Sequence, residues 1–328
     1  NVDGKGISVS DICTGGKFGQ SKTITPVLDE NRFYPSHEGI QHFYRYKEAI
    51  ALFEEMGFKT FRFSINWTRI FPNGDENEPN EAGLEYYENV IDECLKHGIE
   101  PMITISHYEV PFGLTKKCNS WLSRDMITYY LNYCRAIFTR YKGKVRYWLT
   151  FNEINSAIEP MGALLNQGIL NDLENPTTFL EQPDKPQERF QGLHHMFVAS
   201  ALAVKLAKEI DPNYQIGNMM IYMGSYPLTP NPDYVIFNQE YNRINNYFCT
   251  DVQAKGVYPY YIENYFANKG IAIVKEEGDD EILKAGTVDF ITFSYYMSVC
   301  QTTDSSVESG VGNILGGVNN PYLSASDW

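Results

Sequence analysis

The chain lacks the cysteine spacing that metal and redox motifs use. Its six cysteines stand at positions 13, 94, 118, 134, 249 and 300, with no CxxC pair and no close Cys/His cluster. The cysteines therefore indicate reduced thiols, with Cys94 and Cys134 in phase with helical apolar stripes as small core residues. We expect no metal site and no cofactor, and reduced thiols favour the cytoplasm.

The chain is also poor in basic residues and in long apolar runs. It has 27 Lys and Arg against 41 Asp and Glu, a net charge of −14, and no basic block. This balance argues against a nucleic-acid partner or an anionic membrane surface. No apolar segment is long enough to span a bilayer. We expect a small-molecule partner, and the sequence is compatible with a homo-oligomer.

A repeated local pattern is present instead. Three helix-period runs are each followed by a glycine and a β-rich run: 36–56 with Gly57 and "FKTFRFS", 80–97 with Gly98 and "IEPMITIS", and 123–142 with Gly143 and "KVRYWLTFNE". Each glycine stands where a helix C-cap needs a left-handed residue. The pattern predicts consecutive αβ units.

Two further strands, "QIGNMMI" from Gln215 and "VDFITFSYY" from Val288, bring the predicted strands to five. The 328 residues alone allow two ordinary domains or one large barrel. Because no dinucleotide or phosphate-loop glycine motif occurs, we predict an α/β fold, a (β/α)8 TIM barrel with about five of its eight strands, as a single domain over residues 1–328. Residues 301–320 are predicted as a long βα loop, and "LENPTTFLEQPDKPQERF" as an insertion before the next helix.

Polar side chains end the predicted strands, and in such barrels the working face lies at the carboxyl ends of the strands. They are Arg62, His107, Tyr108, Glu109, Asn152, Glu153 and Tyr296. Taken singly, a histidine here is more often structural, an arginine pairs with a buried acid and a tyrosine fills the barrel. Glu153 is harder to dismiss, because an ionisable group after an apolar strand is desolvated. The set favours sugar binding, and glycosidic cleavage needs two carboxyl groups.

Four motifs, "FRFSINWTRIFPNG", "TISHYEVP", "TFNEIN" and "FSYYMS", resemble glycoside hydrolase family one, the retaining β-glycosidases on a (β/α)8 barrel. The resemblance covers nearly the whole chain in order. "GKGISVSDICTGG", "HYE" in place of "HWD", and "FSYY" in place of "NYY" are similar to the bacterial 6-phospho-β-glucosidase branch.

The resemblance implies roles for individual residues. Glu153 matches the general acid/base, while Arg62 and Tyr296 match the pair that contacts the nucleophile carboxylate. Asn152 and His107 match sugar-hydroxyl ligands, and Tyr108 takes the place of the tryptophan of "HWD" in the substrate site. The implied reaction is retaining hydrolysis of phosphorylated β-glucosides, either disaccharides or aryl glucosides.

Departures from the family keep other functions open. The nucleophile motif "ENG" and the phosphate loop have no counterpart here, so we expect the chain to be cut at both ends, the nucleophile to follow Trp328 and the isolated chain to be inactive. Ala49 replaces an aspartate, and Asn119 and Ser120 replace the glycines of "GGW". The alternatives are a plain β-glucosidase, a 6-phospho-β-galactosidase or a catalytically silent sugar-binding fragment, in which Glu109 is the only rival carboxylate on the rim.

Overall fold

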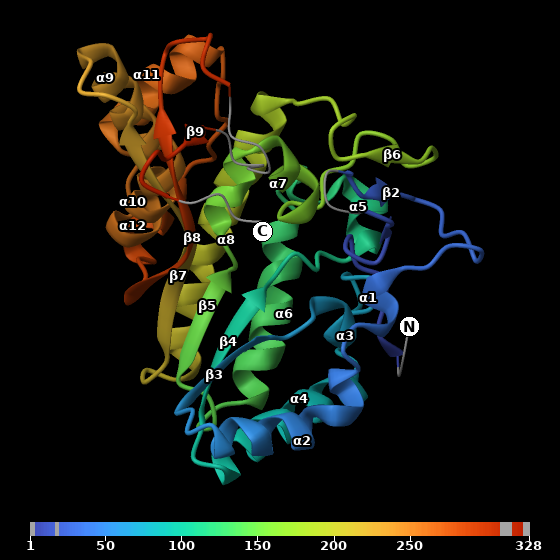
Figure 1. Cartoon of the computed structure of the whole chain (residues 1–328). Coiled ribbons are helices and arrows are strands. Elements are labelled where there is room, and N and C mark those ends of the chain that lie inside the picture. Colours follow the sequence, from blue (N-terminus) through green and yellow to red (C-terminus); the bar gives the residue numbers. More distant parts are fainter. Residues whose placement is uncertain (1–3, 17–19, 309–316, 324–328) are drawn as a thin grey trace.

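A six-stranded sheet forms the centre of the computed structural model, which describes residues 4–16, 20–308 and 317–323 (Figure 1). Its strand order is β3-β4-β5-β7-β8-β9. The first five strands are parallel, in chain order: β3 Thr60–Ser64, β4 Glu100–Ser106, β5 Tyr147–Phe151, β7 Gln215–Pro227 and β8 Phe290–Gln301. The five predicted strands are therefore confirmed, and all their carboxyl ends meet at one edge of the sheet.

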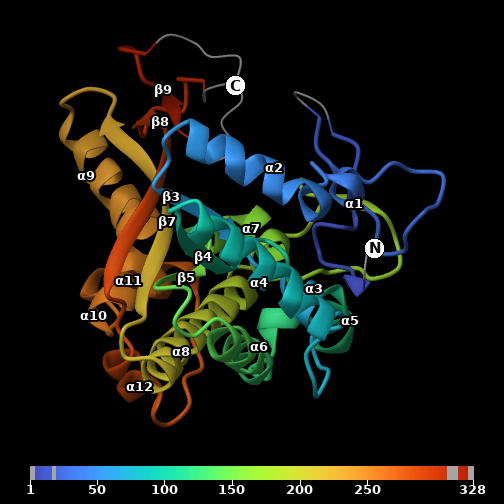
Figure 2. The same ribbon diagram turned by 90° about the horizontal axis from the view of Figure 1, so that it is seen from below.

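Five of the helices that link these strands lie along one side of the sheet (Figure 2). They are α4 Glu81–Lys96, α6 Met126–Arg140, α8 Pro186–Ile210, α10 Phe248–Lys255 and α12 Asp279–Ala285. Viewed along the strands, the sheet is an arc with α4, α6 and α8 on its outer side (Figure 2). The α/β class is confirmed, and within the described residues the arc is not closed into a barrel.

The apolar stripe of α6 explains how this layer packs. Tyr130, Cys134 and Ile137 recur at helical spacing and are fully buried. The strand beneath, β5, is buried on both faces, as expected for the middle of a parallel sheet. Tyr130 also donates a hydrogen bond of 2.7 Å to the backbone oxygen of Thr150, so its polar end is satisfied inside the core. Cys94 is likewise buried, and all six cysteines are free.

The predicted helix over residues 36–56 is wrong at its start. The structure has a short α1, Pro35–Glu38, and then α2, His42–Glu55. Gly39 and Gln41 between them have φ of 51° and 54°, and no right-handed α-helix continues through residues of positive φ; Gln41 has the left-handed conformation. By contrast, Gly57, Gly98 and Gly143 all have positive φ after their helices, as the C-cap prediction requires.

The long loop predicted over residues 301–320 is also corrected. β9, Val318–Asn319, returns to pair antiparallel with the end of β8, while residues 309–316 lie outside the described part. The insertion before α8 contains β6, Thr177–Thr178, which joins β1 and β2 in a small antiparallel sheet. The remaining elements are β1 Cys13–Thr14, β2 Thr23–Ile24, α3 Trp67–Ile70, α5 Phe112–Cys118, η2 Ser120–Leu122, η3 Ile154–Ile158, α7 Pro160–Leu165, α9 Pro232–Tyr241, the π-helix η4 Asn242–Tyr247 and α11 Tyr260–Lys269. Of the described helices, none is long and apolar enough to cross a membrane.

Candidate active site

Glu153 stands at the centre of the polar groups on the strand ends. Its side chain is buried, and two phenols donate hydrogen bonds to its carboxylate: Tyr108 to Oε2 at 2.5 Å and Tyr296 to Oε1 at 3.0 Å. Tyr108 follows β4 and Tyr296 lies on β8, so two other strands hold the carboxylate that β5 presents. Hydrogen bonds to an ionised acceptor are the stronger kind, so this arrangement fixes the direction of the carboxylate.

A second connection joins β3 to the same site. The guanidinium of Arg62 donates to the side-chain oxygen of Asn152, and its Nε donates to Thr104 Oγ1 at 2.9 Å. Burial lowers the pKa of Arg62, and the neighbouring Glu153 carboxylate opposes that shift. Arg62 therefore remains a cation whose charge faces a carboxylate, with Asn152 oriented between the strands.

His107 contributes a neutral ring to this group. Burial, together with the nearby Arg62 cation, lowers the pKa of His107 to about 4. At neutral pH its imidazole has one donor and one acceptor nitrogen, which suits a ligand with hydroxyl groups. Its ring meets that of Tyr108 edge-on, with the centroids 5.2 Å apart. The structure thus brings all six predicted site residues together.

Glu109 belongs to a different set of contacts. Burial raises the pKa of Glu109 to about 7, against the opposing charge of Lys5. One of its carboxyl oxygens has no hydrogen-bond partner among the described residues. The other charges acting on it are Asp11 and Arg69, and no contact joins it to Glu153 within the described chain. It therefore fits an acid that keeps its proton up to about neutral pH better than a partner for Glu153.

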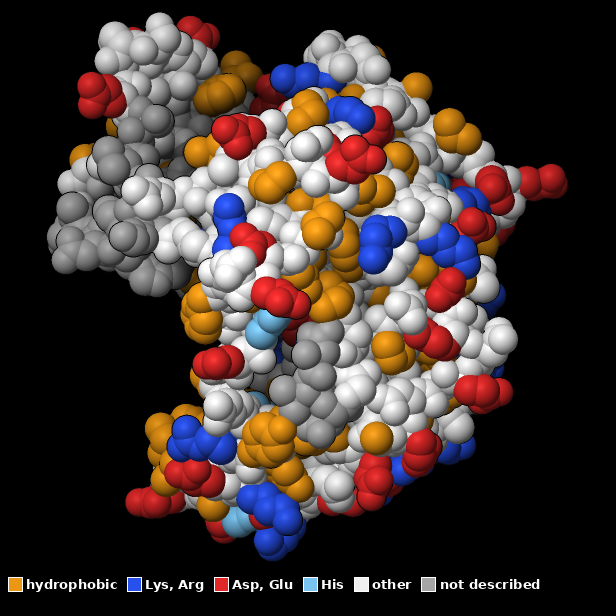
Figure 3. Space-filling view, turned by 90° about the vertical axis from the view of Figure 1, so that its right-hand side faces the viewer, with side chains coloured by type: hydrophobic (Ala, Val, Ile, Leu, Met, Phe, Trp, Pro, Cys, Tyr) orange, Lys and Arg blue, Asp and Glu red, His pale blue; other side chains and the backbone are white. Residues whose placement is uncertain are grey.

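A cavity of about 520 Å³ opens beside these groups, between the strand ends and the α1–α2 segment. Arg62, Thr104, His107 and Glu109 line its strand side, and His42 and Phe43 line its helix side. On the face that carries the N-terminal segment, acidic and basic side chains are interspersed, and its described part has no broad patch of one charge (Figure 3). Within the described residues no group of three or more His, Cys, Asp or Glu side chains could hold a metal ion.

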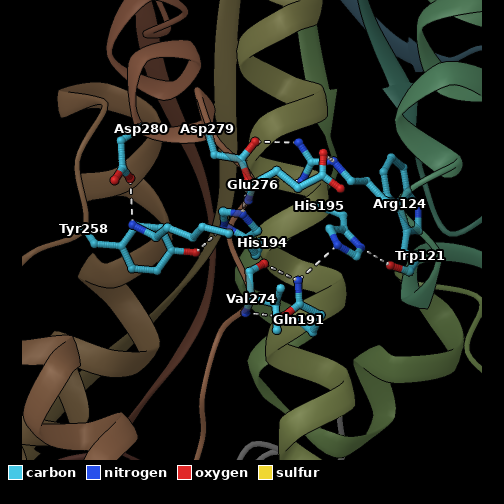
Figure 4. Close-up of polar contacts among 11 residues, drawn as sticks. Trp121, Arg124, Gln191, His194, His195, Tyr258, Val274, Glu276, Asp279 and Asp280 are labelled. Atoms are coloured by element: carbon cyan, nitrogen blue, oxygen red, sulfur yellow. Dashed lines mark hydrogen bonds and ion pairs between the residues drawn. The ribbon is translucent and has the colours of Figure 1, made fainter.

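Another polar cluster, shown in Figure 4, lies in the helix layer. His194 on α8 is fully buried between Asp279 of α12, 2.9 Å from its Nε2, and the hydroxyl of Tyr258, 3.0 Å from its Nδ1. Arg124 donates to the same carboxylate at 3.0 Å. Burial is the main cause of the lowered pKa of His194. Because these groups bond one another, the cluster fastens α12 to α8 and supplies no group to the strand ends.

The glycosyl hydrolase family 1 model matches residues 1–327. The chain belongs to this family. Among curated relatives, a 6-phospho-beta-glucosidase of Clostridium longisporum is 49% identical over all of this chain and 66% of its own length. The aryl-phospho-beta-D-glucosidase BglA of Bacillus subtilis is 46% identical over all of this chain and 68% of its own. The chain thus spans about two thirds of the length of these relatives.

A solved family 1 β-glucosidase from Thermotoga maritima has the same fold, with a TM-score of 0.73 at 26% identity. The match covers 91% of this chain and 61% of that one. The (β/α)8 fold predicted from the strand pattern therefore agrees with the family. The family 1 motifs also fall where the prediction placed them, at the ends of β3, β4, β5 and β8.

Two contacts at this family 1 site differ from the sequence prediction in detail. Tyr108 was expected in the substrate site in place of a tryptophan, and its hydroxyl bonds Glu153. Tyr296 was expected beside the nucleophile, and within the described chain its hydroxyl also bonds Glu153. Sequence reasoning missed Asn166, whose amide contacts the backbone at Glu153. No motif marks an asparagine after a short helix as part of a site.

The departure at "CNSW" has a structural counterpart. Asn119 and Ser120, at the positions of the two family glycines, have φ of 55° and 53°. Asn119 Oδ1 accepts a hydrogen bond of 2.9 Å from the backbone of Leu170, while the hydroxyl of Ser120 is buried without a partner among the described residues. A left-handed backbone explains why glycine suits both positions.

Proposed function

We propose that the protein is a retaining glycosidase that hydrolyses 6-phospho-β-glucosides, phosphorylated disaccharides or aryl glucosides. The observation that carries the proposal is the Glu153 carboxylate, buried at a strand end and held by two phenol donors. The phosphorylated substrate is supported by relatives at 49% and 46% identity, which are named for phospho-β-glucosides.

In this proposal Glu153 is the general acid/base. It protonates the leaving glycosidic oxygen in the first step and, as a carboxylate, activates water in the second. Asn152, oriented by Arg62, binds a hydroxyl next to the reacting carbon, and neutral His107 binds another hydroxyl of the same sugar. Tyr108 and Tyr296 keep the carboxylate directed at the bond to be cleaved.

Retention needs a second carboxylate about 5 Å from the first. We propose that this nucleophile comes from a part of the protein beyond Trp328, because within the described chain no contact joins Glu109 to Glu153. Because no second carboxylate contacts Glu153 within the described chain, the 328 residues taken alone favour the alternative of a catalytically silent sugar-binding fragment. Sugar binding without turnover by the isolated chain, and turnover by the full-length protein, is the expected pair of results.

The substrate is tested with three nitrophenyl glycosides: glucoside, glucoside 6-phosphate and galactoside 6-phosphate. The proposal expects the highest kcat/KM for glucoside 6-phosphate, and expects Glu153→Gln to abolish most of it. Faster turnover of the plain glucoside would make the protein a β-glucosidase, and faster turnover of the galactoside 6-phosphate would make it a phospho-β-galactosidase. We also propose a cytoplasmic location from the free thiols, tested by the fraction of a bacterial lysate that holds the activity.

A further inference from the structure

The turn that carries Glu153 has a strained backbone. Glu153 has φ of 42° and ψ of 51°, the left-handed conformation, which is unfavourable for a residue with a side chain. The backbone enters this turn from β5 and leaves it into η3. Because a side chain leaves the backbone in a direction set by φ and ψ, relaxation of this turn would move the carboxylate away from Tyr108 and Tyr296. Something must therefore hold the turn.

Asn166 supplies the hydrogen bonds. It follows α7, and its side chain returns to the turn and is almost fully buried. Its Nδ2 lies 3.1 Å from the backbone oxygen of Glu153, 3.3 Å from that of Asn152 and 3.0 Å from Ser156 Oγ. The first two of these acceptors belong to the peptide units on either side of the strained residue. The amide thus binds the backbone of the turn and leaves the carboxylate oxygens to Tyr108 and Tyr296.

Asn155 is a natural comparison, since it lies in the same turn and is equally buried. Its Nδ2 donates to the backbone oxygens of Ile221 at 2.8 Å and Asn245 at 2.7 Å, and its Oδ1 accepts from the backbone of Ile221 at 2.9 Å. These bonds fasten η3 to β7 and the π-helix, but none reaches an atom of Glu153. A comparison of variants at the two asparagines therefore distinguishes a loss of fold stability, expected at Asn155, from a loss of carboxylate position, expected at Asn166.

We propose that Asn166 is a positioning residue for the general acid, acting by holding Glu153 in its left-handed conformation. The inference rests on the proposed role of Glu153. It implies that loss of Asn166 weakens proton donation to the leaving group while the sugar-binding groups stay in place. Substrate binding should then change less than the step that needs the proton.

The leaving group separates these effects. From a dinitrophenyl 6-phosphoglucoside the dinitrophenolate leaves without a proton, whereas from the phenyl 6-phosphoglucoside the phenol oxygen must be protonated as it leaves. In the full-length protein, Asn166→Leu removes the donors at nearly constant shape. We expect kcat/KM for the phenyl substrate to fall at least about tenfold, because general acids contribute roughly 10²–10⁴-fold, and that for the dinitrophenyl substrate to fall less than about threefold.

Two controls make the result decisive. Asn155→Leu removes three bonds outside Glu153, so it should lower Tm and affect both substrates equally. Glu153→Gln should show the steepest dependence on the leaving group; a flat response there would reject the proposed function itself. An equal loss on both substrates for Asn166→Leu, beside a steep Glu153→Gln, would overturn only the role of Asn166. For Asn166→Ser, which retains one donor, kcat/KM for the phenyl substrate should lie between the values for Asn166→Leu and the parent. This variant provides the same test if the leucine variant does not fold.

Discussion

Replacing Ser120 by glycine should stabilise the protein. Ser120 is fully buried in η2, directly before Trp121, and its φ of 53° is left-handed. Its hydroxyl has no hydrogen-bond partner among the described residues. Glycine removes both unfavourable features and leaves the chain direction at Trp121 unchanged.

The size of the effect follows from three terms. Relief of the left-handed conformation is worth about 1 kcal/mol, and removal of a buried, unsatisfied hydroxyl about 1–3 kcal/mol. The greater freedom of glycine in the unfolded chain opposes these by about 0.5–1 kcal/mol. We therefore expect Ser120→Gly to raise the free energy of unfolding by about 1–3.5 kcal/mol, and Tm by about 1–5 °C.

Asn119→Gly is the matched control. Asn119 is also left-handed, but asparagine tolerates that conformation and its Oδ1 accepts the buried backbone N–H of Leu170. Its loss leaves that N–H without a partner, so stability should fall by about 1–3 kcal/mol. Thermal and urea denaturation of both variants of the full-length protein measure the difference. A lower Tm for Ser120→Gly, or changes of the same sign at the two positions, would refute the reasoning.

Three further predictions concern single groups. Glu109→Gln should leave turnover largely intact, whereas Glu153→Gln cripples it. Burial raises the pKa of Glu109 to about 7, so its contribution to the free energy of unfolding is present below about pH 4.5 and lost as pH rises through 7. In urea denaturation at pH 8, Glu109→Gln should therefore be more stable than the parent protein. Equal losses of turnover would instead make Glu109 a catalytic partner. Tyr108→Phe should reduce kcat about tenfold, because the Glu153 carboxylate loses one of its two phenol donors; an unchanged kcat contradicts the contact. Burial alone would raise the pKa of Asp279, but hydrogen bonds from its neighbours lower it to about 2, so its contribution of about 2 kcal/mol is present above pH 4 and disappears toward pH 2; urea titrations of Asp279→Asn should show that this acid dependence is gone.

The secondary structure could be predicted where local periodicity decides it. The stripe containing Tyr130, Cys134 and Ile137 became the buried face of α6, and the apolar run of β5 became a strand buried on both sides. The break before α2 could not be predicted, because it depends on Gln41 in a left-handed conformation. Glutamine has no preference for that conformation, so the sequence around it indicates a continuous helix.

The membership of the site could also be predicted, but not its contacts. Parallel strands bring their carboxyl ends together, so residues that end the strands must meet at one edge. Which atoms meet depends on backbone angles that the sequence does not reveal. Tyr108, whose hydroxyl bonds Glu153, has φ of 61°, and Glu153 has φ of 42°; neither tyrosine nor glutamate favours a positive φ. The contacts of the Asn166 amide depend instead on how the chain returns after α7, which no local motif indicates.

The left-handed Glu153 also bears on how this position tolerates change. A backbone of this shape suits glycine, asparagine or aspartate, so the residue that the proposed chemistry requires is a poor one for the stability of the turn. This one residue is therefore held in an unfavourable backbone conformation, and hydrogen bonds from Asn166, Tyr108 and Tyr296 oppose its relaxation. Selection for a more stable fold alone would draw this position away from glutamate, so the presence of glutamate here is a mark of function that the fold itself does not need.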